Sequence, residues 1–505
     1  MVFVYTASEI YSPKRGVMLA YSSTGKPWLH VILSVFLISL CVACLADGAR
    51  DSASLVADLD AELPVVVANG NSPSTQVAVV QRDQIIWSQA FGQNTSPHHV
   101  YMNASVQKMF TAVAVLQLVE RGFVELDADV QEYLPFAVQH PRFPKTPITV
   151  RMLLAQRSGL ADFPHQFAWD TGCAFSPQYR SCPGDNVLAL SHEAFLRASL
   201  VPGGSNYDQQ TWGAEPGQVY YYSVSAYPLL RYLVSHVTGQ SYAEYMHENI
   251  FDPLEMANSG FSVDEFAERH TIPYTRIDGA NIELPIWNGQ GSMMHTTAED
   301  MAKFMQTLLN DGQHDDFQLL QSETVALMQQ RASRFKVFLK SSDDLPSTGF
   351  GLGLISFRGG WLGFGGSAPG YQCLLRYHPS RQVGYVILVN VNAILGGGDN
   401  YESARREIYA VQDALVAILD PTLVIRYRAG EVLIFVAAGS VWAYFMRKKP
   451  RIVVALGGVW SLFGGFWMFK SIPVGLGFLV MGVIVLVWGG INLVKARQVP
   501  LETDV

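Results

Sequence analysis

Hydrophobic residues form long uninterrupted runs at both ends of the chain, whereas in the middle they alternate with polar residues. Residues 28–46 (WLHVILSVFLISLCVACLA) carry no charged side chain, and three further apolar runs cover residues 432–446, 452–469 and 472–494. Runs without a polar face are typical of targeting or membrane-spanning segments. A helix that packs on the core of a soluble domain instead shows an apolar stripe of period 3.6 on one face. The pattern therefore separates two hydrophobic ends from a middle segment, residues 47–428, with the periodicities of a folded domain.

The first apolar run has the features of a secretory signal. Lys26 precedes it, and the small residues Ala43 and Ala46 stand where a signal peptidase could cut. Because the stretch ahead of the run is long, Met18 is an alternative start that gives a signal of ordinary length. We expect residues 1–46 to be a signal peptide or an N-terminal anchor.

The three later runs are predicted to be transmembrane helices within residues 429–497, followed by a short cytoplasmic tail, residues 498–505. The last run is long enough to span a hydrocarbon core of about 30 Å. Basic residues gather between the first and second runs and again after the third: Arg447, Lys448, Lys449, Arg451, Lys495 and Arg497. Because basic loops remain in the cytoplasm, the middle segment is expected outside it. We predict a multi-pass protein of the cytoplasmic (inner) membrane, with its folded domain in the periplasm or extracellular space and the lipid bilayer as a partner.

Strand-like segments stand at both ends of the middle segment. Residues 76–80 and 85–87 flank a turn at Arg82-Asp83, and residues 373–377 and 383–391 flank a second turn near Pro379. Two such hairpins predict a single antiparallel sheet built from both ends of the domain.

Helical periodicity dominates between the two hairpins. The expected helices cover residues 106–121, 149–154, 225–237, 242–249 and 297–310. The fold class is therefore predicted to be α+β, with helices flanking one antiparallel sheet.

Composition restricts the function classes. Charged residues make up 15% of the 505 residues, compared with about 25% in an ordinary soluble domain. An aromatic content of 12% excludes a disordered chain. Lys and Arg number 35 against 43 Asp and Glu, so there is no basic excess with which to bind nucleic acid. The low charge is consistent with the apolar ends.

Cysteine usage fits an exported domain. Cys173 and Cys182 flank a short segment containing Pro and Ser, and an oxidising compartment would allow a disulfide between them. Two free thiols are the alternative. No His/Cys cluster has the spacing of a zinc site, so no metal or other cofactor is expected.

A candidate nucleophile stands at the start of the most apolar predicted helix. Ser105 and Lys108 are three residues apart, which places hydroxyl and amine on one helix face. A neutral lysine could take the hydroxyl proton, and the helix N-terminus would favour a developing oxyanion. Ser23 with Lys26 and Ser333 with Lys336 show the same spacing. Taken alone, the motif is therefore better explained by a capping serine and a solvated lysine.

The surrounding sequence resembles a known family. Residues 103–135 are similar to the nucleophile region of the serine β-lactamase and penicillin-binding-protein-like hydrolases, in particular their class C and esterase-like branch. Further blocks follow in the family's order, at residues 148–160, 216–223, 291–300 and 363–371. The resemblance implies a β-lactamase/transpeptidase-like fold with a helical subdomain. Members of the family with three terminal membrane spans include membrane-bound peptidases. This similarity concerns the architecture and does not fix the chemistry.

The resemblance also implies roles for individual residues. Ser105 would be the acylated nucleophile, Lys108 its proton partner, and Tyr222 a proton relay to the leaving group. The neighbouring Tyr220 and Tyr221 could confuse the register, and we expect at least one of the three tyrosines to pack in the core. The backbone N–H groups of Ser105 and Ser367 would form the oxyanion hole.

Two positions depart from the family's pattern. Val224 stands where the family usually has Asn, and Phe364 stands where it usually has His or Lys. A phenylalanine supplies no hydrogen bond to a substrate carboxylate. The substrate-binding surface, expected at Val224, Phe364, Gly365 and Gly366, should therefore favour uncharged, apolar acyl groups.

Three hypotheses remain for the function. The first is a membrane-anchored serine hydrolase that forms an acyl-enzyme with esters or amides, of esterase, amidase or peptidase type. The second is a β-lactamase or D,D-peptidase proper, which Phe364 disfavours. The third is a catalytically weak or inert sensor or binding protein. His295 is the nearest alternative catalytic residue, although a core or surface role is the simpler explanation for a single histidine.

Overall fold

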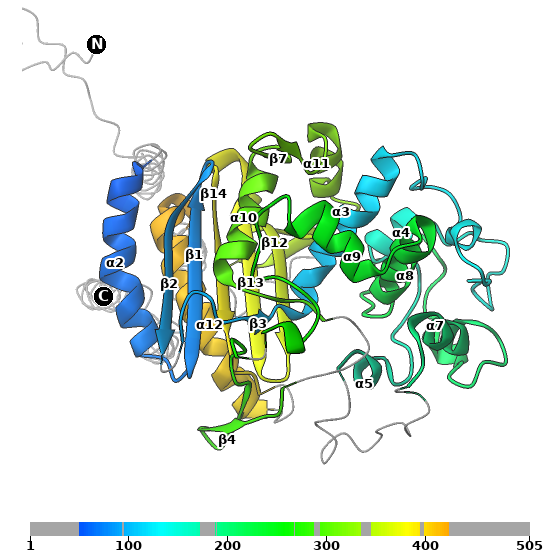
Figure 1. Cartoon of the computed structure of the whole chain (residues 1–505), viewed down its shortest axis with the longest axis horizontal. Helices are drawn as coiled ribbons and strands as arrows, with labels where there is room; N and C mark the ends of the chain where they lie inside the picture. The colour runs from blue at the N-terminus through cyan, green and yellow to red at the C-terminus, as the bar shows by residue number, and fades with distance from the viewer. Residues whose placement is uncertain are drawn as a thin grey trace, which may run out of the picture. The chain divides into compact units, whose positions relative to one another are not determined.

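An eight-stranded antiparallel sheet forms the centre of the part of the chain that the structure describes (Figure 1). In spatial order its strands are β2 (Gln84–Gly92), β1 (Ser74–Gln81), β14 (Val383–Val389), β13 (Tyr371–His378), β12 (Leu362–Ala368), β11 (Ile355–Phe357), β10 (Ser347–Phe350) and β9 (Ser333–Arg334). The first and last strands along the chain lie side by side, because β1 pairs with β14 from Thr75↔Val389 to Gln81↔Val383. The predicted α+β class and the single sheet built from both ends are confirmed.

The computed structural model describes residues 50–92, 95–171, 187, 189–266, 268–286, 293–334, 345–393 and 398–423. The predicted signal peptide, the predicted spans and tail, and Cys173 and Cys182 lie outside the described residues. Among the helices that are described, none is both long enough and apolar enough to cross a membrane. Residues 49–421 form one compact unit.

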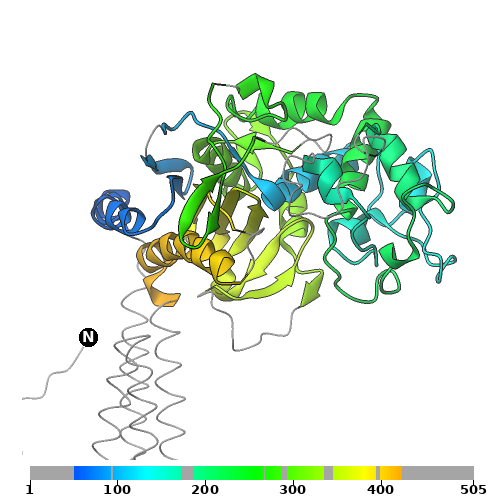
Figure 2. The same cartoon turned by 90° about the horizontal axis from the view of Figure 1, so that it is seen from below.

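Helices cover both faces of the sheet, which explains why its central strands are buried on both sides. All eight side chains of β13 and all seven of β14 are buried. On one face lie α2 (Ser52–Ala68) and α12 (Gly398–Leu419), which also pack on each other (Figure 2). On the other face α10 (Ala298–Leu309) contacts β1 and β14. The sequence analysis missed α2 and α12, although Leu55, Leu59 and Leu63 of α2 recur at helical spacing and are buried.

The remaining helices gather beyond the far edge of the sheet (Figure 1). They are α3 (Gln107–Glu120), α4 (Val150–Leu154), α5 (Gln166–Thr171), α7 (His192–Leu200), α8 (Ala226–Thr238), α9 (Tyr242–Met246) and α11 (Ser322–Gln329). The helices predicted from periodicity agree with α3, α4, α8, α9 and α10. Every residue of α3 from Gln107 to Leu118 is buried, so α3 forms the centre of the hydrophobic core that sheet and helices share.

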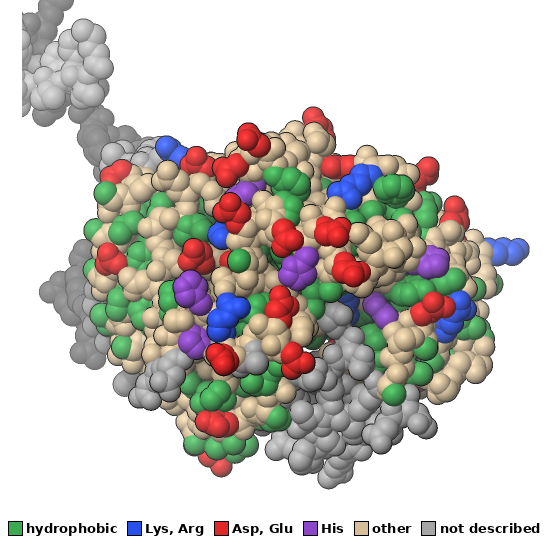
Figure 3. All heavy atoms as spheres, in the orientation of Figure 1, with side chains coloured by type: hydrophobic (Ala, Val, Ile, Leu, Met, Phe, Trp, Pro, Cys, Tyr) green, Lys and Arg blue, Asp and Glu red, His purple; other side chains and the backbone are tan. Residues whose placement is uncertain are grey.

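Three small two-stranded sheets complete the fold: β3 (Tyr101–Met102) with β6 (His295–Thr296), β4 (Tyr274–Ile277) with β5 (Ala280–Glu283), and β7 (Gln313–His314) with β8 (Phe317–Gln318). The first of them leads directly into the candidate nucleophile. On the face shown in Figure 3, acidic and basic side chains are interspersed over the surface.

Two buried histidines, His270 and His295, and the partly buried His192 should make the fold sensitive to acid. Burial lowers the pKa of His192 and of His295 to about 3, and that of His270 to about 4. In the unfolded chain a histidine has a pKa of about 6.5, so as the pH falls the unfolded state binds protons first. Above about pH 6.5 these histidines are neutral in both states and do not affect the free energy of unfolding. Below that pH they lower it, by up to about 1.4 kcal/mol per histidine and pH unit.

Urea unfolding of the full chain at about pH 7 and about pH 5 measures this effect. We expect a lower midpoint at the lower pH, and a smaller difference in the variant H270F/H295F. These two rings pack edge to face with 4.5 Å between centroids, so phenylalanine conserves the packing. An unchanged pH difference in the double variant would show that the two histidines are not responsible.

Candidate active site

Ser105 stands where a strained turn leads into α3. The preceding residue, Ala104, has a φ of 47°, a left-handed conformation that is uncommon for a residue with a Cβ and is often found at functional sites. A short 3₁₀ turn, Ala104–Val106, then continues into α3. On one side, Asn103 donates its backbone N–H to Met294 O, and Met294 N donates to Gln107 Oε1. The loop before β6 therefore holds the turn, a contact that the sequence did not predict.

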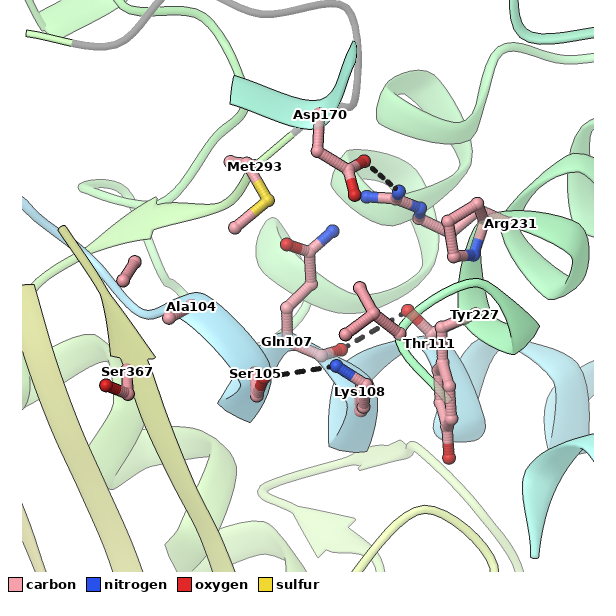
Figure 4. A pocket seen from close by; sticks show the side chains of 13 residues that line it. Ala104, Ser105, Gln107, Lys108, Thr111, Asp170, Tyr227, Arg231, Met293 and Ser367 are labelled. Carbon is pink, nitrogen blue, oxygen red and sulfur yellow. Dashed lines mark hydrogen bonds and ion pairs between the residues drawn. The ribbon is translucent and has the colours of Figure 1, made fainter. Parts of the chain in front are cut away.

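The structure brings Ser105, Lys108 and Tyr222 together. Lys108 Nζ and the Tyr222 hydroxyl each donate a hydrogen bond to Ser105 Oγ over 3.1 Å, and Figure 4 shows Lys108 pointing at Ser105. Lys108 is buried and lies 5.3 Å and 5.5 Å from the ring centroids of Tyr222 and Tyr227. Both distances to Oγ lie within the range of direct proton transfer. The arrangement places two groups that can exchange a proton beside one hydroxyl, as a serine nucleophile requires.

Gln156 holds the tyrosine segment in place. Its side-chain Nε2 donates to Ser223 O and its Oε1 accepts from Ser223 N, while Gln156 O accepts from Tyr221 N. On the next residue, Val224 N donates to Asp162 Oδ1 over 2.6 Å. Tyr222 is therefore fixed from both sides through the backbone. Neither Gln156 nor Asp162 was identified from the sequence, since nothing in a single chain indicates which distant loop they support.

The three consecutive tyrosines have different environments. Tyr220 packs against Phe350 with 5.4 Å between ring centroids, and burial strongly raises the pKa of its hydroxyl. Tyr221 and Tyr222 are exposed, and Tyr222 is the one with a hydrogen bond to Ser105. The expectation that one of the three packs in the core therefore applies to Tyr220.

Removing the Tyr222 hydroxyl should slow catalysis without disturbing the fold. We expect Y222F to lower kcat for ester hydrolysis by about 100-fold, because one positioned proton donor and acceptor is lost. Y221F provides the matched control, since it removes a hydroxyl from the adjacent exposed ring. Equal losses in both variants would exclude a specific role for Tyr222.

Strand β12 faces the nucleophile across the site. A Cβ on Gly366 would lie 2.3 Å from Asn103 O, so glycine allows the strand to approach the turn before Ser105. Ser367, the next residue, lines the same cavity as Ser105. Its Oγ accepts a hydrogen bond from Asn392 Nδ2 over 2.7 Å, and the same nitrogen donates to Ala368 O. Asn392, which follows β14, thus anchors the end of β12 and was also missed.

Phe364, a residue of the same strand, is buried in aromatic packing. It is 2% exposed, and its ring packs edge to face on Phe350 at 5.9 Å. Phe350 in turn contacts Tyr220, so three aromatic rings fill the space under the site. Phe364, Gly365 and Gly366 are not among the residues that line the cavity around Ser105. The contact that the structure shows for Phe364 is packing on Phe350, and a substrate contact from this residue stays a prediction.

A cavity of about 100 Å³ extends from Ser105 between α3, α5 and α8. It is lined by Ala104, Ser105, Gln107, Lys108, Thr111, Asp170, Val224, Tyr227, Pro228, Arg231, Met293, Ser367 and Ala368. Val224 is thus a wall of the cavity, as predicted. Burial raises the pKa of Asp170, whereas the neighbouring Arg231, Gln166 and Lys108 act to lower it.

Other candidates from the sequence do not join the site. His295 is buried and does not line the cavity. Ser333, from the second Ser-x-x-Lys match, belongs to β9 at the sheet edge. Within the described ranges, no three His, Cys, Asp or Glu side chains are grouped so that they could hold a metal ion.

Known proteins have sequences related to this chain. A family profile described as Beta-lactamase matches residues 54–408. Protein flp of Staphylococcus aureus (strain MRSA252) is 22% identical over 344 residues, which are 64% of this chain and 60% of that protein. Penicillin-binding protein 4 of Amycolatopsis lactamdurans is 28% identical over 305 residues, 58% of this chain and 72% of that protein. The chain thus spans about three fifths of the length of the first relative.

Solved structures show the same fold. The octameric penicillin-binding protein homologue from Pyrococcus abyssi has a TM-score of 0.56 at 22% identity, covering 72% of this chain and 77% of that one. D-amino acid amidase from Ochrobactrum anthropi SV3 has a TM-score of 0.54 at 21% identity, covering 72% and 98%. EstCE1, a hydrolase with promiscuous acyltransferase activity, has a TM-score of 0.53 at 19% identity, covering 72% and 99%. Since the family profile covers well over half of the chain, the protein belongs to the Beta-lactamase family.

Proposed function

We propose that the protein is a serine hydrolase that acts through an acyl-enzyme on Ser105. The observation that carries this proposal is the pair of 3.1 Å hydrogen bonds that converge on Ser105 Oγ from Lys108 and Tyr222. Ser105 Oγ attacks the carbonyl carbon of an ester or amide, and its proton passes to Lys108 or Tyr222. The same groups return a proton to the leaving alcohol or amine as its bond to the carbonyl breaks.

The oxyanion of the tetrahedral intermediate is held by the backbone N–H groups of Ser105 and Ser367. Both residues line one cavity, and fixed backbone donors cost no reorganisation when the charge develops. Water then attacks the acyl-enzyme, which releases the carboxylic acid and regenerates the Ser105 hydroxyl. The reaction needs no cofactor.

The substrate is proposed to be an ester or amide without a recognised carboxylate. Support comes from the aromatic cluster at Phe364, which occupies the place where the family usually has a cation, and from the apolar Val224 in the cavity wall. Two similar structures are described as an amidase and a hydrolase with acyltransferase activity, which agrees with this class.

The location is proposed from the sequence. The uncharged run at residues 28–46, the three apolar runs within residues 429–497 and the basic residues between them support a membrane-anchored enzyme with an extracytoplasmic catalytic domain. A disulfide between Cys173 and Cys182 belongs to the same proposal, since it requires an oxidising compartment.

Labelling of the full chain with a fluorophosphonate probe tests the proposal, followed by turnover of a simple ester, nitrocefin and a D-Ala-D-Ala peptide. We expect covalent labelling and ester turnover, with little activity on the two carboxylate-bearing substrates. Rapid nitrocefin or peptide turnover would instead assign a β-lactamase or D,D-peptidase. The absence of labelling would favour an inert binding protein.

A further inference from the structure

A buried ion pair closes the inner end of the cavity that begins at Ser105. Arg231 of α8 donates from Nη2 to Asp170 Oδ1 of α5 over 3.0 Å, and the two side chains are 5% and 6% exposed. Gln166 Nε2 donates to the other carboxylate oxygen over 2.7 Å. Figure 4 shows the pair across the cavity from Ser105 and Lys108. The ion pair and Ser105 therefore line one small chamber.

Such a pair is not explained by stability. Removing two charges from water costs several kcal/mol per ion, and buried ion pairs are often replaced by apolar residues without loss of stability. Arg276 and Glu407, between β4 and α12, form another buried pair at 3% and 13% exposure, but neither lines this cavity. The Asp170–Arg231 pair differs in that its polar groups line a space connected to the candidate nucleophile.

The chemistry of the pair defines what can bind there. A guanidinium offers only donors, and a carboxylate offers only acceptors with room for about four hydrogen bonds. Side by side they complement a group that accepts and donates at once, such as a carboxamide. Because the two charges cancel, the pair provides no net attraction for a carboxylate. The space is small, since it measures about 100 Å³ and a cavity of about 150 Å³ is needed to accommodate benzene, so the acyl group must be short.

The acyl side of the substrate is the part that fits this chamber. The acyl group stays bonded to Ser105 Oγ after the leaving group departs, so it can occupy a closed space. The leaving group must reach solvent, and Tyr222, which donates to Ser105 Oγ, is a side chain that is 37% exposed. A methylene chain would pass Val224, Pro228 and Met293 in the cavity wall before its polar end reaches the ion pair.

We infer that Asp170 and Arg231 determine substrate specificity by selecting short acyl groups that end in an uncharged donor–acceptor group such as a carboxamide. This inference rests on the proposed hydrolase function. Phe364 and Val224 led to the expectation that the substrate carries an apolar acyl group. The inference replaces this with an acyl group that has a polar end, because Asp170 and Arg231 line the cavity.

Three methyl esters with acyl chains of equal heavy-atom count test the inference: methyl succinamate, methyl 4-methylpentanoate and monomethyl succinate. They end in a carboxamide, an isopropyl group and a carboxylate. We expect kcat/KM of the full chain to be at least about 10-fold higher for the carboxamide than for either of the others, as buried hydrogen bonds to charged groups discriminate on this scale. The double variant D170L/R231M, which leaves no unpaired charge, should lose this preference. The matched double variant R276M/E407L should keep it.

The inference would be wrong if the wild type hydrolysed the isopropyl or the carboxylate ester as fast as the carboxamide ester. It would also be wrong if D170L/R231M kept the wild-type preference. Fluorophosphonate labelling of Ser105 in the same preparations separates these results from failure of the proposed function. If labelling is absent, binding of the three esters to the full chain by ligand-observed NMR decides the inference. Preferential binding of the carboxamide ester then supports it, and equal binding overturns it.

Discussion

Replacing Ser105 with alanine is expected to abolish covalent labelling by a fluorophosphonate and to reduce ester turnover by about 10⁴-fold or more. The hydroxyl oxygen is the atom on which both Lys108 and Tyr222 converge, so its loss removes the atom that these two groups are placed to activate. Backbone donors and the remaining binding contacts leave only a residual acceleration over water. Intact-mass spectrometry after labelling, together with kcat/KM for a methyl ester, measures both effects.

The chain provides its own control for this prediction. Ser333 has the same spacing to a lysine in the sequence but lies in β9 at the edge of the sheet. S333A should label and turn over substrate like the wild type. Labelling that persists in S105A would show that another residue is the nucleophile and would contradict the proposed mechanism.

Replacing Lys108 is expected to reduce kcat for ester hydrolysis by about 10³-fold, within the range of general acid–base catalysis. K108M fills a similar volume in a site where the native side chain is buried, but it cannot accept a proton. K108R should be equally impaired, because a guanidinium remains protonated and cannot act as a base. Stopped-flow measurement of the acylation step would separate this loss from a defect in substrate binding.

K303R is the matched control, since Lys303 is a lysine of α10 whose Nζ donates to Glu255 O and lies 3.9 Å from Asp300. It should show wild-type rates. Substantial activity in K108R would indicate that Lys108 supplies only a positive charge, and Tyr222 would then be the proton acceptor.

Much of the fold followed from local patterns. The alternation in residues 76–80 was sufficient to predict β1. The hairpin near Pro379 was sufficient to predict β13 and β14, because these two strands are adjacent along the chain. The long α2 and α12 were missed, since both cover a sheet that is itself built from distant segments. Leu55, Leu59 and Leu63 of α2 recur at helical spacing, but only the structure shows that they are buried.

The candidate site was predictable to the extent that its residues are close in sequence or belong to a known motif. Ser105 and Lys108 are three residues apart on one helix face, and Tyr222 came from a resemblance. Gln156 and Asn392 could not be found in this way, because their amide groups act on backbone atoms 67 and 24 positions away along the chain.

Sequence alone determined the family resemblance, the strands at the two ends of the domain and the candidate nucleophile, because each depends on short-range periodicity or on motifs read within one segment. Only the tertiary structure showed that Phe364 packs on Phe350 and that Asp170 and Arg231 line the cavity. Asp170 and Arg231 lie 61 residues apart on different helices, and a charged residue in a single chain carries no sign of being buried. Burial and pairing arise from packing, and they decide which polar groups can meet a substrate.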